Sequence, residues 1–288
     1  MTRPFRTLIQ TEELAASLGD PDWVVVDCRF TLSDPEAGIE AWRRSRLPGA
    51  RYLHLEDDLA GPVGEYSGRH PLPDPAALAA RLARCGITAQ SQVVAYDDSF
   101  GSIAGRLWWM LRWLGHDAVA LLDGGFQKWR RERRELESVR PAAPAAGGSL
   151  RPVPERGAWV GAAEVEQALA RGGALLIDAR APERFTGEEE PFDPVAGHIP
   201  GAVNRPFEDN LDIDGTFLSP AELRAAFEAI LGGLPPQRAI HVCGSGVTAC
   251  HNLLAMEVAG LAGSRLYPGS WSEWITDPRH PIAVGEAA

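Results

Sequence analysis

Ala239-Ile-His-Val-Cys-Gly-Ser-Gly-Val-Thr-Ala249 is an apolar run that leads into a glycine-containing loop, and residues 250–259 follow it with an apolar helical pattern. The run predicts a buried strand, the two glycines predict a tight loop, and the spacing of Ala, Leu and Met predicts a helix that Gly260 can end. Cys243 therefore lies where a strand ends and a helix begins. Loop amides and a helix N-terminus place partial positive charge around such a position.

This position predicts a reactive thiol. An ordinary cysteine, with a pKa of ~8.5, is about 3% thiolate at pH 7, whereas helix N-termini lower the pKa to ~3.5–7.5. The alternative for Cys243 is a buried packing role. The flanking Gly244 and Gly246, at the carboxyl end of a strand where open α/β sheets bind ligands, favour a sulfur nucleophile.

The other three cysteines lack this setting. Cys28, Cys85 and Cys250 form no Cys-x-x-Cys pair, and the step from Cys243 to Cys250 fits no common zinc spacing. We interpret them as packing residues, with Cys250 as the minor candidate for a redox partner. We expect neither a metal nor a cofactor.

Composition limits the class of protein. A chain of 288 residues is long for one hydrophobic core and sufficient for two. Its four cysteines make no disulfide scaffold, the N-terminus has no apolar signal-peptide region, and no long apolar run occurs, so we expect a cytoplasmic protein with no membrane partner. A formal net charge of -11 argues against nucleic acid as a partner, because binding a phosphate backbone requires a basic face.

Two similar series of elements follow one another along the chain. Strand patterns occur at 23–27, 93–96, 119–122, 175–178, 239–242 and near Leu266, and helix patterns occur at 11–19, 39–46, 74–85, 104–114, 162–170, 219–230 and 250–259. Between the two series, residues 138–157 are rich in proline and glycine and predict a linker.

Matching landmarks indicate an internal duplication. The two members of each pair lie 145 to 152 residues apart: Asp27 and Asp178, Pro48 and Pro200, Asp97 and Cys243, Gly124 and Gly269, Trp129 and Trp274. Alternating strands and helices predict an α/β fold, with a mainly parallel sheet flanked by helices in each half. We predict an N-terminal domain at 1–137 and a catalytic domain at 158–288. The first is expected to be inactive, because Asp97 in place of a cysteine cannot accept sulfur.

These residues resemble the tandem-domain rhodanese sulfurtransferases, which comprise thiosulfate and 3-mercaptopyruvate sulfurtransferases. The resemblance covers nearly the whole chain and rests on Leu47-Pro-Gly-Ala50, Leu122-Asp-Gly-Gly-Phe126, Asp178-Ala-Arg180, Arg184-Phe185, Gly197-His-Ile-Pro-Gly-Ala202, Cys243-Gly-Ser-Gly-Val-Thr-Ala-Cys250 and Gly269-Ser-Trp271. In such enzymes a Cys thiolate accepts a sulfane sulfur, becomes a persulfide, and passes the sulfur to cyanide or a thiol.

The resemblance implies roles for particular residues. Cys243 would be the nucleophile and persulfide carrier, and Arg184 would grip the anionic group of the donor. The implied cradle for the sulfur consists of Gly244, Ser245, Gly246, Val247 and Thr248. The implied partners are a small anionic sulfur donor and, as acceptor, cyanide, a small thiol or a thioredoxin-like protein. A glycine loop suits this chemistry because its amides reach a persulfide without obstruction by side chains.

The chain departs from the family pattern in its proton relay. Mercaptopyruvate enzymes of this type use a Ser-His-Asp relay, to which Ser245 and His70 correspond. The position expected to hold the Asp reads His54, and Glu56 and Asp57 are the carboxylates that could substitute.

The choice of donor follows from charge. The second donor-binding Arg of the family is missing from residues 190–192, and Arg205 could compensate for it. The Arg and Lys that follow the Cys in thiosulfate enzymes are replaced here by Gly244 and Ser245. Without a cation in the loop, dianionic thiosulfate is poorly stabilised, whereas Ser245 could protonate the enolate that leaves from 3-mercaptopyruvate. We therefore predict 3-mercaptopyruvate as the donor, with thiosulfate as the alternative.

Two other functions compete with this prediction. Cell-cycle dual-specificity phosphatases resemble this architecture, but their loop is one residue longer and ends in an Arg, where this chain has Ala249. A non-catalytic binding module is the other candidate, and the intact loop around Cys243 argues against it. Asp178 and Arg180 are interpreted as a structural pair, and His198 as a structural histidine.

Overall fold

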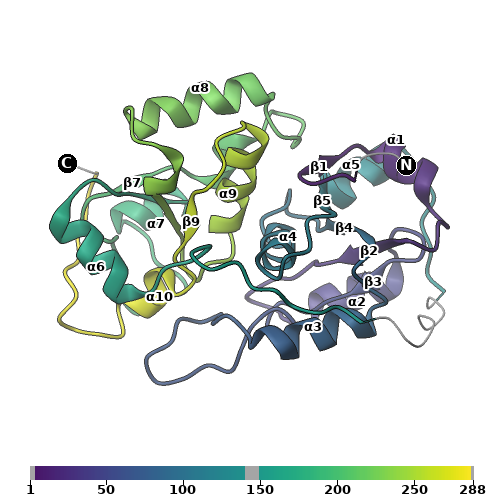
Figure 1. Cartoon of the computed structure of the whole chain (residues 1–288), viewed down its shortest axis with the longest axis horizontal. Coiled ribbons are helices and arrows are strands. Elements are labelled where there is room, and N and C mark those ends of the chain that lie inside the picture. Colours follow the sequence, from purple (N-terminus) through teal and green to yellow (C-terminus); the bar gives the residue numbers. More distant parts are fainter. Residues whose placement is uncertain (1–3, 140–148, 287–288) are drawn as a thin grey trace. The chain divides into compact units, whose positions relative to one another are not determined.

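The computed structural model describes residues 4–139 and 149–286. These residues form two compact units, which are shown in Figure 1. The described part of unit 1 consists of residues 4–61, 73–139, 149–155 and 213–216, and that of unit 2 consists of residues 62–72, 156–212 and 217–286.

Unit 1 contains a parallel sheet whose described strands lie in the order β1-β5-β4-β2-β3. The strands are β1 (Leu8–Ile9), β2 (Trp23–Asp27), β3 (Arg51–Tyr52), β4 (Gln92–Tyr96) and β5 (Val119–Leu122). The helices are α1 (Thr11–Ser17), α2 (Ala37–Arg44), α3 (Pro75–Arg84), α4 (Ala104–Trp113) and α5 (Gly125–Arg131). Strands β4 and β5 are buried along their whole length, as expected of parallel strands covered by helices on both faces.

Unit 2 repeats this arrangement with described strands in the order β7-β6-β8-β9, again parallel. The strands are β6 (Leu175–Asp178), β7 (Ala202–Asn204), β8 (Ala239–Val242) and β9 (Arg265–Leu266). The helices are α6 (Ala162–Arg171), α7 (Pro182–Thr186), α8 (Pro220–Leu231), α9 (Ala249–Val258), α10 (Ser270–Trp274) and the 3-10 helices η1 (Phe207–Asn210) and η2 (Pro236–Arg238). Trp159 forms a parallel β-bridge with Leu266 of β9. It therefore takes the position that β1 holds beside β5 in unit 1.

The predicted α/β fold with an internal duplication is confirmed. In both units a central strand ends in an Asp whose carboxylate binds the Arg two residues later. The shortest N–O distance is 2.6 Å for Asp27 and Arg29, and 2.8 Å for Asp178 and Arg180. These pairs are buried, so the interpretation of Asp178 and Arg180 as a structural pair is also confirmed.

Helix ends follow the predicted caps in two places and differ in a third. The side chain of Asp74 caps α3, and Ser219 and Glu222 form the predicted capping box of α8. The helix predicted at 39–46 instead spans Ala37–Arg44. Arg46 lies beyond its end, because its amide donates to the Glu137 carbonyl at 3.0 Å instead of continuing the helix.

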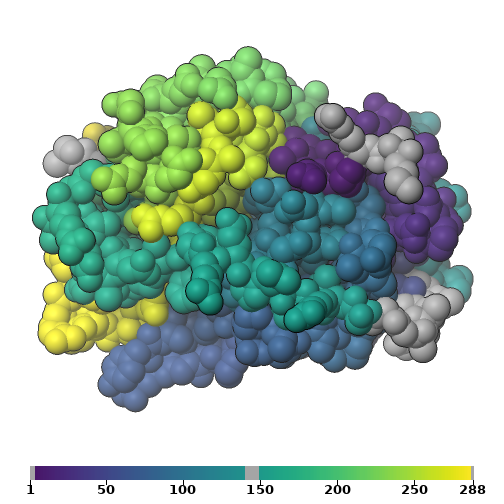
Figure 2. Space-filling view, viewed as in Figure 1, coloured from purple at the N-terminus to yellow at the C-terminus, as the bar shows by residue number. Residues whose placement is uncertain are grey.

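The predicted domain limits differ from the compact units at residues 62–72, at residues 213–216, which group with unit 1, and in the predicted linker. Residues 62–72, placed in the N-terminal domain by the prediction, group with unit 2, and their surface is visible in Figure 2. In the predicted linker 138–157, residues 140–148 lie outside the described residues. Further along, the amides of Val153 and Glu155 donate to carbonyls at the end of α4, so this stretch packs on unit 1. The division into domains at 1–137 and 158–288 stays a prediction.

Candidate active site

Cys243 lies in a buried loop between β8 and α9, as predicted. Its residue is 2% exposed, its amide donates to Ser270 Oγ at 3.0 Å, and its carbonyl accepts the amide of Trp271 at 3.0 Å. Gly246 has a φ of +72°, and a Cβ there would lie 2.3 Å from the carbonyl oxygen of Pro268. Only glycine fits at that position, so the loop is held tightly between its strand and α10.

The backbone of Ser270 is strained, and its side chain contacts this loop. It has a φ of 52°, which is uncommon for a residue other than glycine, and its hydroxyl donates to the Tyr267 carbonyl while accepting the Cys243 amide. Its counterpart in unit 1 is Gly125, which has a φ of +55°. The replacement of this glycine by a serine in the second repeat is a sequence signal for a residue that supports the Cys243 loop, and sequence reasoning missed it.

Two guanidinium groups lie against the loop at Gly244. A Cβ built on Gly244 would lie 3.0 Å from Nη2 of Arg69 and 3.4 Å from Nη2 of Arg184. Arg184 binds the carboxylate of Glu190 at 2.8 Å and that of Asp193 at 3.3 Å. Arg69 also binds Asp193. Both arginines therefore reach the residue next to the nucleophile while paired with carboxylates.

The charges around the loop are balanced. Arg180 binds both Asp178 and Glu190, so three arginines face three carboxylates in this cluster. Burial raises the pKa of the Asp193 carboxyl, while the neighbouring Arg69 acts in the opposite direction. An anion that enters this cluster must therefore compete with a carboxylate that is already there.

Ser245 and His70 are brought together as the relay prediction requires. The distance from Ser245 Oγ to His70 Nδ1 is 2.7 Å, and both residues are buried. His54, at the position expected to hold the Asp, and the candidate substitutes Glu56 and Asp57 belong to unit 1, where His54 contacts Asp57 at 3.6 Å. The third member of the relay stays a prediction.

A family model described as a rhodanese-like domain matches residues 10–132 and again residues 161–277. The chain belongs to the tandem-domain rhodanese sulfurtransferase family. A relative from Pseudomonas aeruginosa, provisionally named 3-mercaptopyruvate sulfurtransferase, is 49% identical over 285 residues, which cover 97% of this chain and 98% of the relative. A relative from Mycobacterium tuberculosis, provisionally named thiosulfate sulfurtransferase SseB, is 40% identical over 98% of each chain.

A solved structure agrees with this chain in fold. It is SseA from Escherichia coli, described with the rhodanese fold and mechanism of 3-mercaptopyruvate sulfotransferases. The TM-score is 0.79 and the identity is 30%, with 93% of this chain and all of the other covered.

In unit 1 the corresponding loop is filled by one of its own side chains. Asp97 follows β4 as Cys243 follows β8, and it is fully buried. Its carboxylate accepts the amides of Ser99, Gly101, Ile103 and Ala104 at 2.8–2.9 Å. Because these amides already bind an anion, the loop offers none of them to a donor or a persulfide, which supports an inactive unit 1.

The four cysteines are all free. Burial raises the pKa of the Cys85 thiol to about 11 and also raises that of Cys28, so neither is a thiolate at neutral pH. These two therefore behave as the predicted packing residues. Cys250 is buried on α9, where its Sγ lies 3.5 Å from the Gly246 carbonyl oxygen.

Two residues considered in the sequence have other partners. Nδ1 of His198 lies 2.8 Å from the Phe185 carbonyl oxygen and the two rings stack, which confirms a structural histidine. Arg205 donates to the side chain of Asn210 at 3.1 Å and lies over the Phe227 ring, so its guanidinium is engaged at η1.

Sequence reasoning missed Arg69, Glu190 and Asp193. The only sequence signal for Arg69 is that it precedes His70, and the ion pair of Arg69 with Asp193 joins residues 124 positions apart. Among the described residues, no group of three or more His, Cys, Asp or Glu side chains is placed to hold a metal. None of the helices in that part of the chain is long and apolar enough to cross a membrane.

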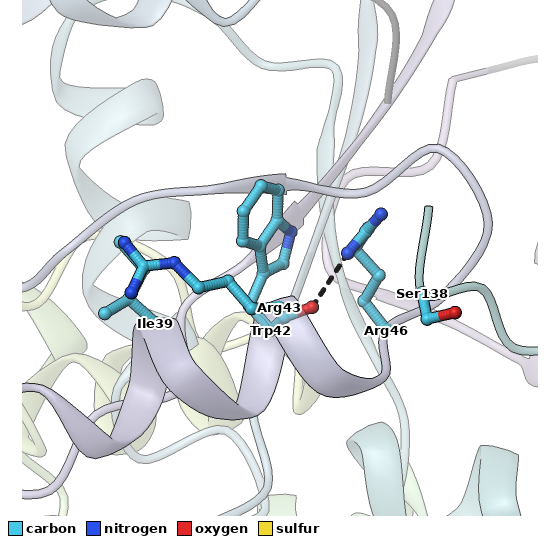
Figure 3. Close-up of a pocket in the computed structure, with 5 residues that line it drawn as sticks. All are labelled: Ile39, Trp42, Arg43, Arg46 and Ser138. Atoms are coloured by element: carbon cyan, nitrogen blue, oxygen red, sulfur yellow. Dashed lines mark hydrogen bonds between the residues drawn. The ribbon is translucent and has the colours of Figure 1, made fainter. Parts of the chain in front are cut away.

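A hollow of about 310 Å³ lies in unit 1, and none of the residues that line it is a predicted site residue. Figure 3 shows its lining residues, Ile39, Trp42, Arg43, Arg46 and Ser138. The Arg46 guanidinium lies over the Trp42 ring and pairs with Glu137 at 3.2 Å, so its charge is already engaged.

His241, on the strand that carries the nucleophile, makes stability depend on pH. Burial lowers its pKa to about 3, and Nδ1 has no hydrogen-bond partner among the described residues. The unfolded value is ~6.5, so both states are neutral above that pH and stability is complete there. Between pH ~6.5 and about 3 only the unfolded state binds the proton, and stability falls as the pH falls, by up to about 1.4 kcal/mol per unit.

We therefore expect a His241→Leu variant to lose less stability than the wild type when the pH is lowered from 7 to 5. Urea unfolding at both pH values measures the difference, with each protein serving as its own reference at pH 7. Equal losses in the two proteins would contradict the assignment to His241.

Proposed function

We propose that this sulfurtransferase moves a sulfane sulfur from 3-mercaptopyruvate to cyanide or a thiol through a persulfide on Cys243. The observation that carries the proposal is Cys243 in its buried glycine loop, with the nearby Ser245 hydroxyl 2.7 Å from His70. Unit 2 therefore contains a nucleophile, a proton donor, and a loop that can hold an anion. A thioredoxin-like protein is a suitable thiol acceptor, and a reducing compartment such as the cytoplasm suits a free thiol nucleophile.

The first half of the reaction forms the persulfide. The Cys243 thiolate attacks the sulfur of 3-mercaptopyruvate, an S–S bond forms and the C–S bond breaks. The electron pair stays on the carbon as the enolate of pyruvate, which takes a proton through Ser245 and His70. Arg184 holds the donor carboxylate, and the amides of residues 244–248 face the persulfide. The acceptor then attacks the outer sulfur and releases the Cys243 thiolate.

The charges near the loop support a monoanionic donor. Arg69 and Arg184 reach Gly244, but Glu190 and Asp193 offset their charge. Thiosulfate is a dianion whose leaving group, sulfite, needs a net positive site. 3-Mercaptopyruvate has a single carboxylate, and its enolate is protonated as it leaves, so it requires less positive charge in the site.

We expect a higher kcat/KM with 3-mercaptopyruvate than with thiosulfate, measured with cyanide and with a dithiol as acceptors. A Gly244→Arg, Ser245→Lys double variant should shift the ratio toward thiosulfate, because it places two cations in the loop. The matched control is Gly244→Ala, Ser245→Ala, which adds a Cβ beside Arg69 without adding charge. A wild type that prefers thiosulfate, in keeping with the provisional name of the Mycobacterium tuberculosis relative, would contradict the donor assignment.

A further inference from the structure

Arg69 is anchored to the nucleophile loop through its backbone. Its amide donates to Ser272 Oγ at 3.0 Å, and the amide of Ser272 donates to the Gly244 carbonyl at 2.9 Å. The preceding Gly68 packs so closely that a Cβ there would lie 2.6 Å from the carbonyl oxygen of Gly269. Segment 62–72 is therefore held in place on unit 2 at the point where Arg69 leaves it.

The guanidinium of Arg69 converges with that of Arg184. Both would lie within 3.4 Å of the same Cβ on Gly244, so they approach one point beside the nucleophile. The Arg69 side chain is 25% exposed, and its buried Nε has no hydrogen-bond partner within residues 4–139 and 149–286. Arg69 thus has donor capacity that its pairing with Asp193 does not use.

Asp193 is a partner that can be exchanged. It bridges the two arginines, and its carboxyl is desolvated by burial, which raises its pKa. A donor carboxylate has the same charge and shape as the Asp193 carboxylate, so it can form the same forked hydrogen bonds.

We propose that Arg69 is the second cation that binds the donor carboxylate, sharing it with Arg184 and releasing Asp193 as the donor enters. This assignment rests on the proposed function and supplies the cation that residues 190–192 lack. Asp193 holds Arg69 in position in the absence of donor and competes with the donor for it.

The test uses Arg69→Ala, Arg69→Lys and Asp193→Asn in the full chain, with Arg184→Ala as the reference. Arg69→Ala should lower kcat/KM for 3-mercaptopyruvate by about tenfold to a hundredfold, mainly through KM, as should Arg184→Ala. Arg69→Lys should recover part of the loss, because it keeps the charge and loses the fork. Asp193→Asn should lower KM, because it removes the competing carboxylate.

A structural role for Arg69 predicts the opposite result for Asp193. If Arg69 only held Asp193 in position, Asp193→Asn would reproduce the loss of kcat/KM seen in Arg69→Ala, and the assignment would be overturned. Arg224→Ala, which removes an exposed cation from α8, controls for net charge. Protection of Cys243 from iodoacetamide by pyruvate measures carboxylate binding without turnover, and it should weaken in Arg69→Ala and not in Arg224→Ala.

The outcome for Arg69 can be separated from that of the proposed function. If the wild type uses thiosulfate instead of 3-mercaptopyruvate, the proposed donor is wrong, and the role of Arg69 is then measured by the protection of Cys243 by pyruvate, because thiosulfate has no carboxylate. Protection of Cys243 by pyruvate that is unchanged in Arg69→Ala, or an unchanged kcat/KM for 3-mercaptopyruvate, overturns the role of Arg69. Thermal unfolding of each variant shows whether a loss reflects the fold.

Discussion

A Cys243→Ala variant is expected to lose sulfur transfer by about three orders of magnitude or more, because without the thiol no covalent intermediate can form. The intact mass of the wild type should increase by one sulfur after treatment with donor and return to its starting value when cyanide is added. The variant should show no such increase. Cys243 is 2% exposed and the substitution removes one buried atom, so the fold should be retained.

Cys250→Ala is the matched control for this experiment. It removes the other thiol near the loop, which belongs to the second residue of α9, and should leave both the added mass and the turnover nearly unchanged. Sulfur that maps to Cys250, or a Cys243→Ala variant with near-normal turnover, would show that the nucleophile has been misassigned.

The second large effect is expected in unit 1, from Asp97→Ala. The Asp97 carboxylate accepts four backbone amides in a fully buried loop, and removing it leaves these donors without an acceptor. Each unsatisfied buried group costs about 1–3 kcal/mol, so a loss of at least about 3 kcal/mol in the free energy of unfolding is expected. Urea unfolding and calorimetry measure this loss.

Asp98→Ala is the control for Asp97→Ala, because Asp98 is the adjacent carboxylate and is exposed. It should change the unfolding free energy by less than about 0.5 kcal/mol. The Asp97→Ala protein that remains folded should keep its sulfur transfer, because the proposed nucleophile lies in unit 2. Equal stability of the two variants would mean that water replaces the carboxylate in the loop at little cost.

Local patterns predicted most of the secondary structure. The strand and helix around Cys243, the Asp74 cap and the Ser219 capping box follow from apolar spacing and cap residues within a few positions of each other. The helix α2 ends before Arg46 because the backbone of Arg46 pairs with that of Glu137, a contact that apolar spacing does not encode. Short strands such as β1 carry too few residues for a periodic signal.

The sequence by itself determined the duplication, the family and the candidate nucleophile, because these depend on residue identity at regular spacing along one chain. Only the tertiary structure placed His70 beside Ser245, 175 positions away, and Arg69 beside Gly244. Such pairs depend on the path of segment 62–72, which is set by its close packing against unit 2. Neither propensity nor periodicity reports contacts between residues so far apart, since those arise only when the packed chain brings the residues together.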